Sequence, residues 1–199
     1  LPLKTLITSF RVDWLISGGL LCAVFLEFAT GDWSAIFAKE RIGVSSGLAA
    51  LPYIVFMIAM IIGRFSAGTL AKRFHIHHTI RFFALVGGGG FLAFLTVTVH
   101  IPSEHKYLAL FTSCISFAFA GMGTSLMAPT FYTAGNRRSS LPSAVVVGQM
   151  GVVNMIAVFI LKAAVAWTAQ FTGSLAIALT IPALMLMSAT FFAHAVKTD

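Results

Sequence analysis

One carboxylate stands deep inside a long apolar segment of this sequence. Glu27 follows Asp13 by 14 residues, which corresponds to about 21 Å along a helix. Thr30 and Ser34 come three and seven residues later, so a helix would place these polar side chains on one face. Because a low dielectric disfavours a charged carboxyl group, such a residue could bind a coupling proton or a cationic solute. The alternative is that Glu27 stays protonated and only bonds a neighbouring helix.

A second acid and a lysine stand at matching depths in two other parts of the apolar sequence. Asp32 lies five residues before the expected outer end of its segment, and Lys162 lies six residues before the outer end of another. A pair between them would relieve the cost of burying either charge. The alternatives are that Asp32 is an interfacial residue and that Lys162 extends to the membrane surface.

Two amides on the segment of Lys162 complete the candidate set. They could line a solute pathway, or they could bond neighbouring backbone, as polar residues between membrane helices often do. The expected solute- or ion-binding residues are therefore Glu27, Thr30, Asp32, Ser34, Gln149, Asn154 and Lys162.

The composition shows what kind of element must position these residues. Of 199 residues, 58% are hydrophobic and only 10% are charged, whereas soluble domains are about 25% charged. The charges stand in short clusters between apolar runs, and each run has the roughly 20 residues that a membrane-spanning helix needs. We expect one six-helix bundle over residues 1–199, with helices at about 13–37, 48–71, 79–99, 107–134, 143–168 and 174–196.

The basic residues predict the orientation of this bundle. With six spans both termini share one side, and that side holds Lys4, Arg11, Lys72, Arg73, Arg81, Arg137, Arg138 and Lys197. The other side holds only Lys39, Arg41 and Lys106. This bias places both termini in the cytoplasm. Because the basic residues are scattered over separate loops, the net charge of +7 does not indicate nucleic-acid binding.

The six helices differ in polarity in a repeating order. Helices 1, 2, 4 and 5 carry charged, amide or small polar residues at depth, whereas helices 3 and 6 carry only Thr and Ser there. In helix 3 the run 87–90 consists of glycine, which favours close helix packing. The order predicts two inverted three-helix units, with helices 3 and 6 outside, as in each half of a major facilitator transporter.

Three sequence segments resemble that superfamily. The stretch 63–74, at the end of helix 2, resembles its loop motif G-x-x-x-D-[RK]-x-G-[RK]-[RK]: Gly68 and Arg73 match, while Lys72 replaces the Asp and His75 a Gly. The segment 27–35, EFATGDWSA, resembles the opening of the second half in a bacterial branch related to fucose permease-like transporters.

The segment 121–135 is similar to the same branch, although 161–163 reads LKA where that branch usually has Gly-Pro-Pro. The resemblance implies the C-terminal half of a secondary transporter in a bacterial inner membrane. It implies a small solute, proton-coupled symport, no cofactor and an N-terminal six-helix half, or a second six-helix subunit, as partner. The gating residues that it suggests are Arg64, Gly68, Arg73, Arg137 and Arg138. With the motif Asp absent, the gate should be weaker or depend on the last two arginines.

Other protein classes fit the sequence less well. A rhomboid-type protease needs a nucleophilic serine in a G-x-S-G turn, and a membrane cytochrome needs histidines in mid-span; neither pattern occurs. No catalytic residue is therefore expected. The cluster His75, His77 and His78 could bind a metal, but it stands alone. The serious alternative is a transporter-like subunit that has a scaffolding role in a larger membrane complex.

Overall fold

Long apolar helices form nearly all of the protein. The structure, a computed structural model, describes residues 11–196, apart from the side chains of residues 67, 68 and 70–72. Within these residues, six helical segments are long and apolar enough to cross a membrane, and no strand occurs. The expected class, an all-α integral membrane protein with six spans, is confirmed.

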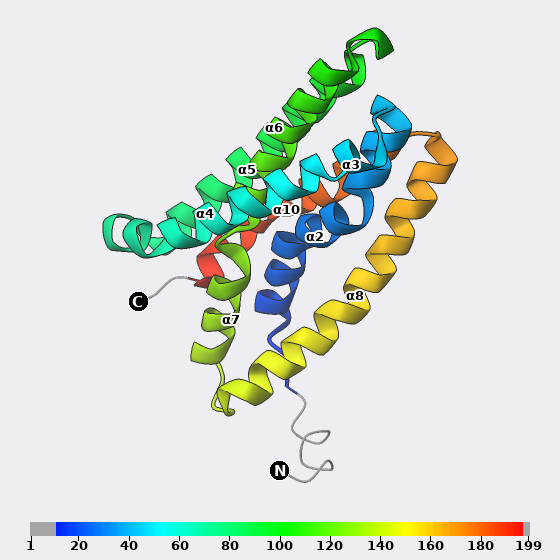
Figure 1. Cartoon of the computed structure of the whole chain (residues 1–199). Helices are drawn as coiled ribbons and strands as arrows, with labels where there is room; N and C mark the ends of the chain where they lie inside the picture. Colours follow the sequence, from blue (N-terminus) through cyan, green and yellow to red (C-terminus); the bar gives the residue numbers. More distant parts are fainter. Residues whose placement is uncertain (1–10, 197–199) are drawn as a thin grey trace.

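The six spans follow one another with short connections (Figure 1). In chain order they are α2 (Trp14–Phe37) with the π-helical turn η1 (Ala38–Ile42); α3 (Ser46–Ala49) with α4 (Leu51–Arg73); α5 (Ile76–His100); the 3-10 turn η2 (Ser103–His105) with α6 (Lys106–Thr124) and α7 (Met127–Arg137); α8 (Ser143–Thr172); and α9 (Leu175–Ala178) with α10 (Thr180–Phe192) and η3 (Ala193–Val196).

Local sequence signals explain where the first and fifth spans begin and end. Asp13 caps α2, because its carboxylate accepts hydrogen bonds from the N–H groups of Leu15 and Ile16 at 3.1 and 3.2 Å. Gly43 and Gly173 end η1 and α8 with φ of 76° and 65°, a left-handed conformation that glycine adopts without a steric penalty. The fifth span continues to Thr172, one turn beyond the expected 143–168.

Three spans that we expected to be continuous are interrupted near a proline. The breaks lie at Ala50, at Ser125–Leu126 and at Leu179. Each stands two to four residues before a proline, namely Pro52, Pro129 and Pro182. A proline inside a helix lacks the N–H donor and its ring clashes with the carbonyl four residues earlier. The fourth span therefore consists of two helices, α6 and α7, rather than one.

The helices pack in a pattern that repeats between the two halves of the chain. Helix α2 packs extensively on α10, and α6 packs extensively on α5. Likewise α6 contacts α4, and α2 contacts α8, while α5 and α10 contact each other. The first three spans thus correspond to the last three: α2 to α6, α4 to α8, and α5 to α10. The contact of α2 with α10 corresponds to that of α6 with α5, and the contact of α6 with α4 corresponds to that of α2 with α8. The fold thus has the arrangement expected for two related three-helix units.

Glycines allow the closest of these contacts. A Cβ on Gly87 would lie 2.3 Å from the Cα of Gly123, so α5 and α6 meet backbone to backbone at this point. On Gly88 a Cβ would meet Met187 of α10, and on Gly90 it would meet Phe119 of α6. The packing role expected for the run 87–90 is confirmed at these three glycines.

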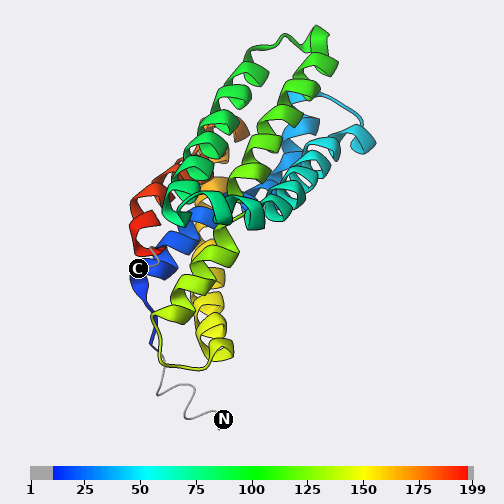
Figure 2. The ribbon, with the colours of Figure 1, turned by 90° about the vertical axis from the view of Figure 1, so that its left-hand side faces the viewer.

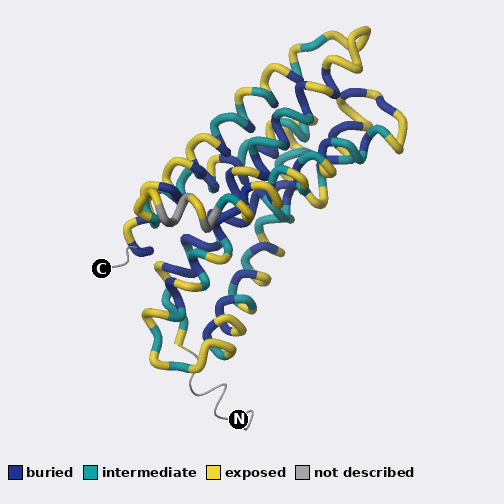
Figure 3. The backbone as a smooth tube through the Cα atoms, turned by 60° about the vertical axis from the view of Figure 1, so that its left-hand side comes forward, coloured by how far each residue is buried: buried dark blue, intermediate teal, exposed yellow. Residues whose placement is uncertain are grey.

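The described chain begins and ends at the same end of the bundle (Figures 1 and 2). This proximal end holds the starts of α2, α5 and α8 and the ends of α4, α7 and η3. The distal end holds α3, η2 and α9. Exposed positions recur along the outer sides of the helices (Figure 3). On α4 and α8 many of these exposed side chains are large and apolar, so much of their surface is left for lipid or for another protein.

Candidate functional site

An ion pair joins α2 to α4 in the middle of the membrane-spanning region. Glu27 is the 14th residue of the 29-residue span Trp14–Ile42. Its Oε1 lies 3.7 Å from Nη2 of Arg64 on α4. The side chains of Glu27 and Arg64 keep 29% and 47% of their accessible surface, so the pair is open to one side of the bundle. The described residues therefore present opposite charges on an accessible surface at membrane depth.

Arg64 lies close to its expected place along the helix, but the structure gives its side chain a partner that we did not expect. The sequence placed it within two turns of the proximal end, where it could extend to the membrane surface and take part in a gate. The structure ends α4 at Arg73, two residues beyond the expected 71, and brings Arg64 within ion-pair distance of Glu27. Arg64 thus lies beside the candidate binding residues. An observation available in the sequence, that Glu27 and Arg64 are opposite charges within apolar segments, could have suggested this pair.

A second ion pair joins α2 to α8 nearer the distal end. Nζ of Lys162 lies 2.6 Å from Oδ2 of Asp32, and both side chains are partly exposed. The same ammonium group lies 5.7 Å from the ring centroid of Phe28, within the range of a cation–π contact. The pairing expected from the matching depths of Asp32 and Lys162 is confirmed. Lys162 is therefore the partner of Asp32, and Arg64 is the partner of Glu27.

The two hydroxyl residues near Glu27 do not share its accessible surface. Thr30 is fully buried and donates a hydrogen bond to the carbonyl of Leu26, one turn earlier in its own helix, at 2.8 Å. Ser34 is 1% exposed, and its hydroxyl has no hydrogen-bond partner among the described residues. Both side chains face the interior of this bundle. The expected polar stripe is thus divided between an accessible carboxylate and two buried hydroxyls.

The two amides of α8 are also buried. Gln149 accepts a hydrogen bond from the backbone N–H of Arg11 at 3.3 Å, which attaches the start of the described chain to α8. Asn154 donates to the carbonyl of Met150 at 3.0 Å, and its Oδ1 is buried without a partner in the described part of the chain. These contacts match the backbone-bonding alternative. Of the seven expected binding residues, Glu27, Asp32 and Lys162 are accessible in this structure.

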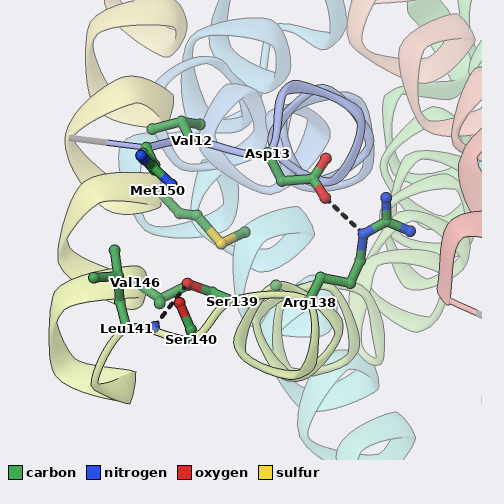
Figure 4. Close-up of a pocket in the computed structure, with 10 residues that line it drawn as sticks. Val12, Asp13, Arg138, Ser139, Ser140, Leu141, Val146 and Met150 are labelled. Atoms are coloured by element: carbon green, nitrogen blue, oxygen red, sulfur yellow. Dashed lines mark hydrogen bonds and ion pairs between the residues drawn. The ribbon is translucent and has the colours of Figure 1, made fainter. Parts of the chain in front are cut away.

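A third ion pair lies at the proximal end, next to a cavity (Figure 4). Nε of Arg138 donates to Oδ2 of Asp13 at 2.6 Å, so the connection between α7 and α8 is tied to the start of α2. The cavity has a volume of about 450 Å³. It is lined by Arg11, Val12, Asp13, Gly135, Arg138, Ser139, Ser140, Leu141, Val146 and Met150. Sequence reasoning selected Arg138 but missed Asp13 as its partner.

The remaining gating candidates lie near the proximal end. Arg73 is the last residue of α4, and Arg137 is the last residue of α7; both are exposed. Gly68 belongs to α4, and its surroundings lie outside the described residues. The segment that resembles the loop motif is thus helical as far as Arg73.

The histidine cluster at the α4–α5 junction brings three rings together. The centroids of His77 and His78 are 4.0 Å apart, and His75 lies about 6 Å from each. Within the residues that the structure describes, no group of three or more His, Cys, Asp or Glu side chains is placed to hold a metal ion. The cluster is therefore not part of the candidate site.

Comparison with known proteins points to the same class as the arrangement of helices and charges. The chain is 28% identical over 189 residues to an uncharacterised MFS-type transporter of Yersinia pestis, where MFS denotes the major facilitator superfamily. The alignment covers 94% of this chain and 46% of the relative. No family model matches the chain. The chain therefore spans about half the length of the curated relative that it matches.

Proposed function

We propose that this chain is one six-helix half of a secondary active transporter of the major facilitator type. It would move a small solute by alternating access, together with a second six-helix unit. The support comes from three sources: six membrane-length helices, a repeated packing pattern, and similarity to half of an MFS-type transporter. In such transporters the solute site lies near the bilayer midplane, between two bundles that move against each other.

The observation that carries this proposal is the accessible Glu27–Arg64 pair, whose carboxylate comes from the middle of the first span. A charged side chain in the hydrocarbon core costs at least about 2.5 kcal/mol, so such residues usually serve ion or solute pathways. This pair lies between α2 and α4, and both side chains remain open to solvent or lipid in the isolated bundle. A second bundle placed against this side would enclose the pair in a polar cavity between the two units.

The other two ion pairs are suited to opening and closing such a cavity. Asp13–Arg138 lies at the proximal end and Asp32–Lys162 lies toward the distal end. Asp32–Lys162 joins α2 to α8, and Asp13–Arg138 joins the start of α2 to the connection that precedes α8. In alternating access, contacts at one end form while those at the other end break. We infer that these pairs contribute to the inner and outer gates, with Arg73, Arg137 and Gly68 near the inner gate.

Charge also supports an orientation and a coupling group for the transporter. The excess of basic residues at the proximal end supports a cytoplasmic location for this end, in what we propose is a bacterial inner membrane. Glu27 is the group that we assign to proton coupling, since it is a carboxylate in mid-span that can exist in neutral or charged form. The segment 27–35 resembles the opening of the second half in fucose permease-like transporters. This resemblance supports the assignment of the chain to the C-terminal half of a transporter of that branch.

Substitution of Glu27 by Gln in the complete transporter tests this function. The substitution removes the titrating group but keeps its size. In proteoliposomes, proton-driven accumulation of solute should be lost, while exchange of solute across the membrane continues. Glu40→Gln, at an exposed carboxylate in η1, is the matched control and should accumulate solute normally. Unchanged accumulation by Glu27→Gln would mean that coupling occurs at another residue.

A further inference from the structure

We propose that Arg64 is the group that binds the solute, and that the solute carries a carboxylate or a phosphate which replaces Glu27 as the partner of Arg64. This inference rests on the proposed function, because it names the class of solute for the same site. It also assigns Arg64, which sequence reasoning placed in a gate, to solute recognition.

The geometry of the pair leaves Arg64 available to another anion. The distance of 3.7 Å between Nη2 of Arg64 and Oε1 of Glu27 is longer than a hydrogen bond. The same nitrogen lies 3.4 Å from the thioether sulfur of Met60, a weak acceptor. Nearly half of the Arg64 side chain is exposed. A guanidinium group has five donors in a planar fork that matches carboxylate and phosphate oxygens, so an anionic solute would form stronger hydrogen bonds than Glu27 does here.

The neighbouring charges do not compete for this position. Helices α9 and α10 both pack against α2, and neither has a charged side chain. Away from their ends, α6 and α7 contribute only the titratable groups of Cys114 and Tyr132. On α8, Lys162 is held by Asp32 at 2.6 Å. Glu27 and Arg64 therefore form a separate pair of opposite charges.

An asymmetry between the two side chains decides the sign of the solute charge. An anion bound to Arg64 displaces Glu27, and the freed carboxylate can take one proton from water and become neutral. A cation bound to Glu27 would instead displace Arg64, which stays charged at any relevant pH. That would leave two positive charges near each other at membrane depth, which is costly. The pair thus accommodates an anion much more readily than a cation.

The exchange of partners couples the solute to a proton. When the anion binds, the Glu27 carboxylate gains H⁺ and forms the neutral acid; when the anion leaves, the acid releases H⁺ and Glu27 pairs again with Arg64. Arg64 and ionised Glu27 together carry no net charge. Arg64, a monoanionic solute and ionised Glu27 would carry one negative charge, and the uptake of one proton by Glu27 returns the net charge to zero. One proton should therefore be taken up for each anion bound.

Binding measurements on the purified full-length transporter test this inference. The probes are L-lactate, succinate and methylphosphonate as anions, glucose and glycerol as neutral solutes, and putrescine as a cation. We expect at least one anionic probe to raise the unfolding temperature of the wild type. Proton uptake, followed with a pH-sensitive dye in weak buffer, should accompany its binding. Glu27→Gln should bind the same probe about tenfold more tightly, because a close competing charge is removed, and it should take up no proton.

Three variants complete the test. Arg64→Gln should lose anion binding, and the double variant Glu27→Gln with Arg64→Gln, which leaves no unpaired charge, should fold and also fail to bind. Glu40→Gln, at the exposed carboxylate in η1, should bind the anion as the wild type does. The inference is overturned if no anionic probe binds the wild type, if binding persists in both Arg64 variants, or if no proton accompanies binding. Transport of a neutral solute by a protein that binds no anion would refute this inference but leave the proposed function intact.

Discussion

At the scale of single residues, the acids of the first span organise the polar chemistry of the protein. Asp13, Glu27 and Asp32 lie at the start, middle and distal part of this span, and each has a basic partner on a different element. The partners come from the α7–α8 connection, from α4 and from α8. Helix α2 is thus linked to two neighbouring spans by charge, in a bundle held together mainly by apolar packing.

The Asp32–Lys162 pair allows a direct test of this linkage. Asp32→Asn or Lys162→Gln alone should lower the midpoint of thermal unfolding in detergent, because each leaves one partly buried charge without its partner. The double variant should be more stable than the sum of the two single effects predicts. For side chains this exposed, the coupling energy should be about 0.2–1 kcal/mol. Strictly additive effects would show that the contact contributes nothing to stability.

Sequence reasoning identified some of these contacts and missed others for identifiable reasons. The Asp32–Lys162 pair could be predicted, because both residues stand at a similar distance from the outer ends of their helices. The partner of Glu27 did not follow from matching depths, because Arg64 lies nine residues before the proximal end of α4 whereas Glu27 is the 14th residue of its span; only their opposite charges within apolar segments could have suggested the pair. The burial of Thr30 and Ser34 depends on which helix covers which side of α2, and the spacing of polar residues does not determine that.

At the scale of the helices, proline and glycine control shape and distance. The three interrupted spans each have a proline two to four residues after the break. Because a proline disturbs the helical turn that precedes it, the sequence could have predicted these interruptions. The glycines act differently, because they allow α5 to approach α6 and α10 closely. Sequence predicted that the run 87–90 packs tightly, but the partners of each glycine required the structure.

Neighbouring glycines in α5 provide a matched pair for testing this packing. Gly87→Ala should lower stability by about 1–3 kcal/mol, because its Cβ would overlap the backbone of Gly123 and separate the two helices. Gly89→Ala meets no atom within 4 Å, and it should be neutral or stabilise by up to about 1 kcal/mol through helix propensity. Unfolding of both variants in the same detergent measures the difference. Equal effects would contradict the close α5–α6 contact.

At the scale of the whole molecule, several features of the chain support the proposal that it works with a second unit. The composition and the length of the apolar runs were sufficient to predict six spans. The repeated order of polar and plain helices predicted two three-helix units, whereas the packing of α2 on α10 and of α6 on α5 came from the structure. Exposed apolar strips on α4 and α8, the open side of the Glu27–Arg64 pair, and a relative of about twice the aligned length all agree with a second unit beside this one.

Transport by separated and combined units is the most direct test of the central claim. This chain, the remainder of the transporter, and both expressed together would be reconstituted in proteoliposomes loaded with a pH-sensitive dye. Proton-coupled solute flux should appear only when both units are present, because a single bundle supplies one wall of the pathway. It should disappear again when this chain carries Glu27→Gln. Proton-coupled flux by this chain alone, as a monomer, would contradict the account.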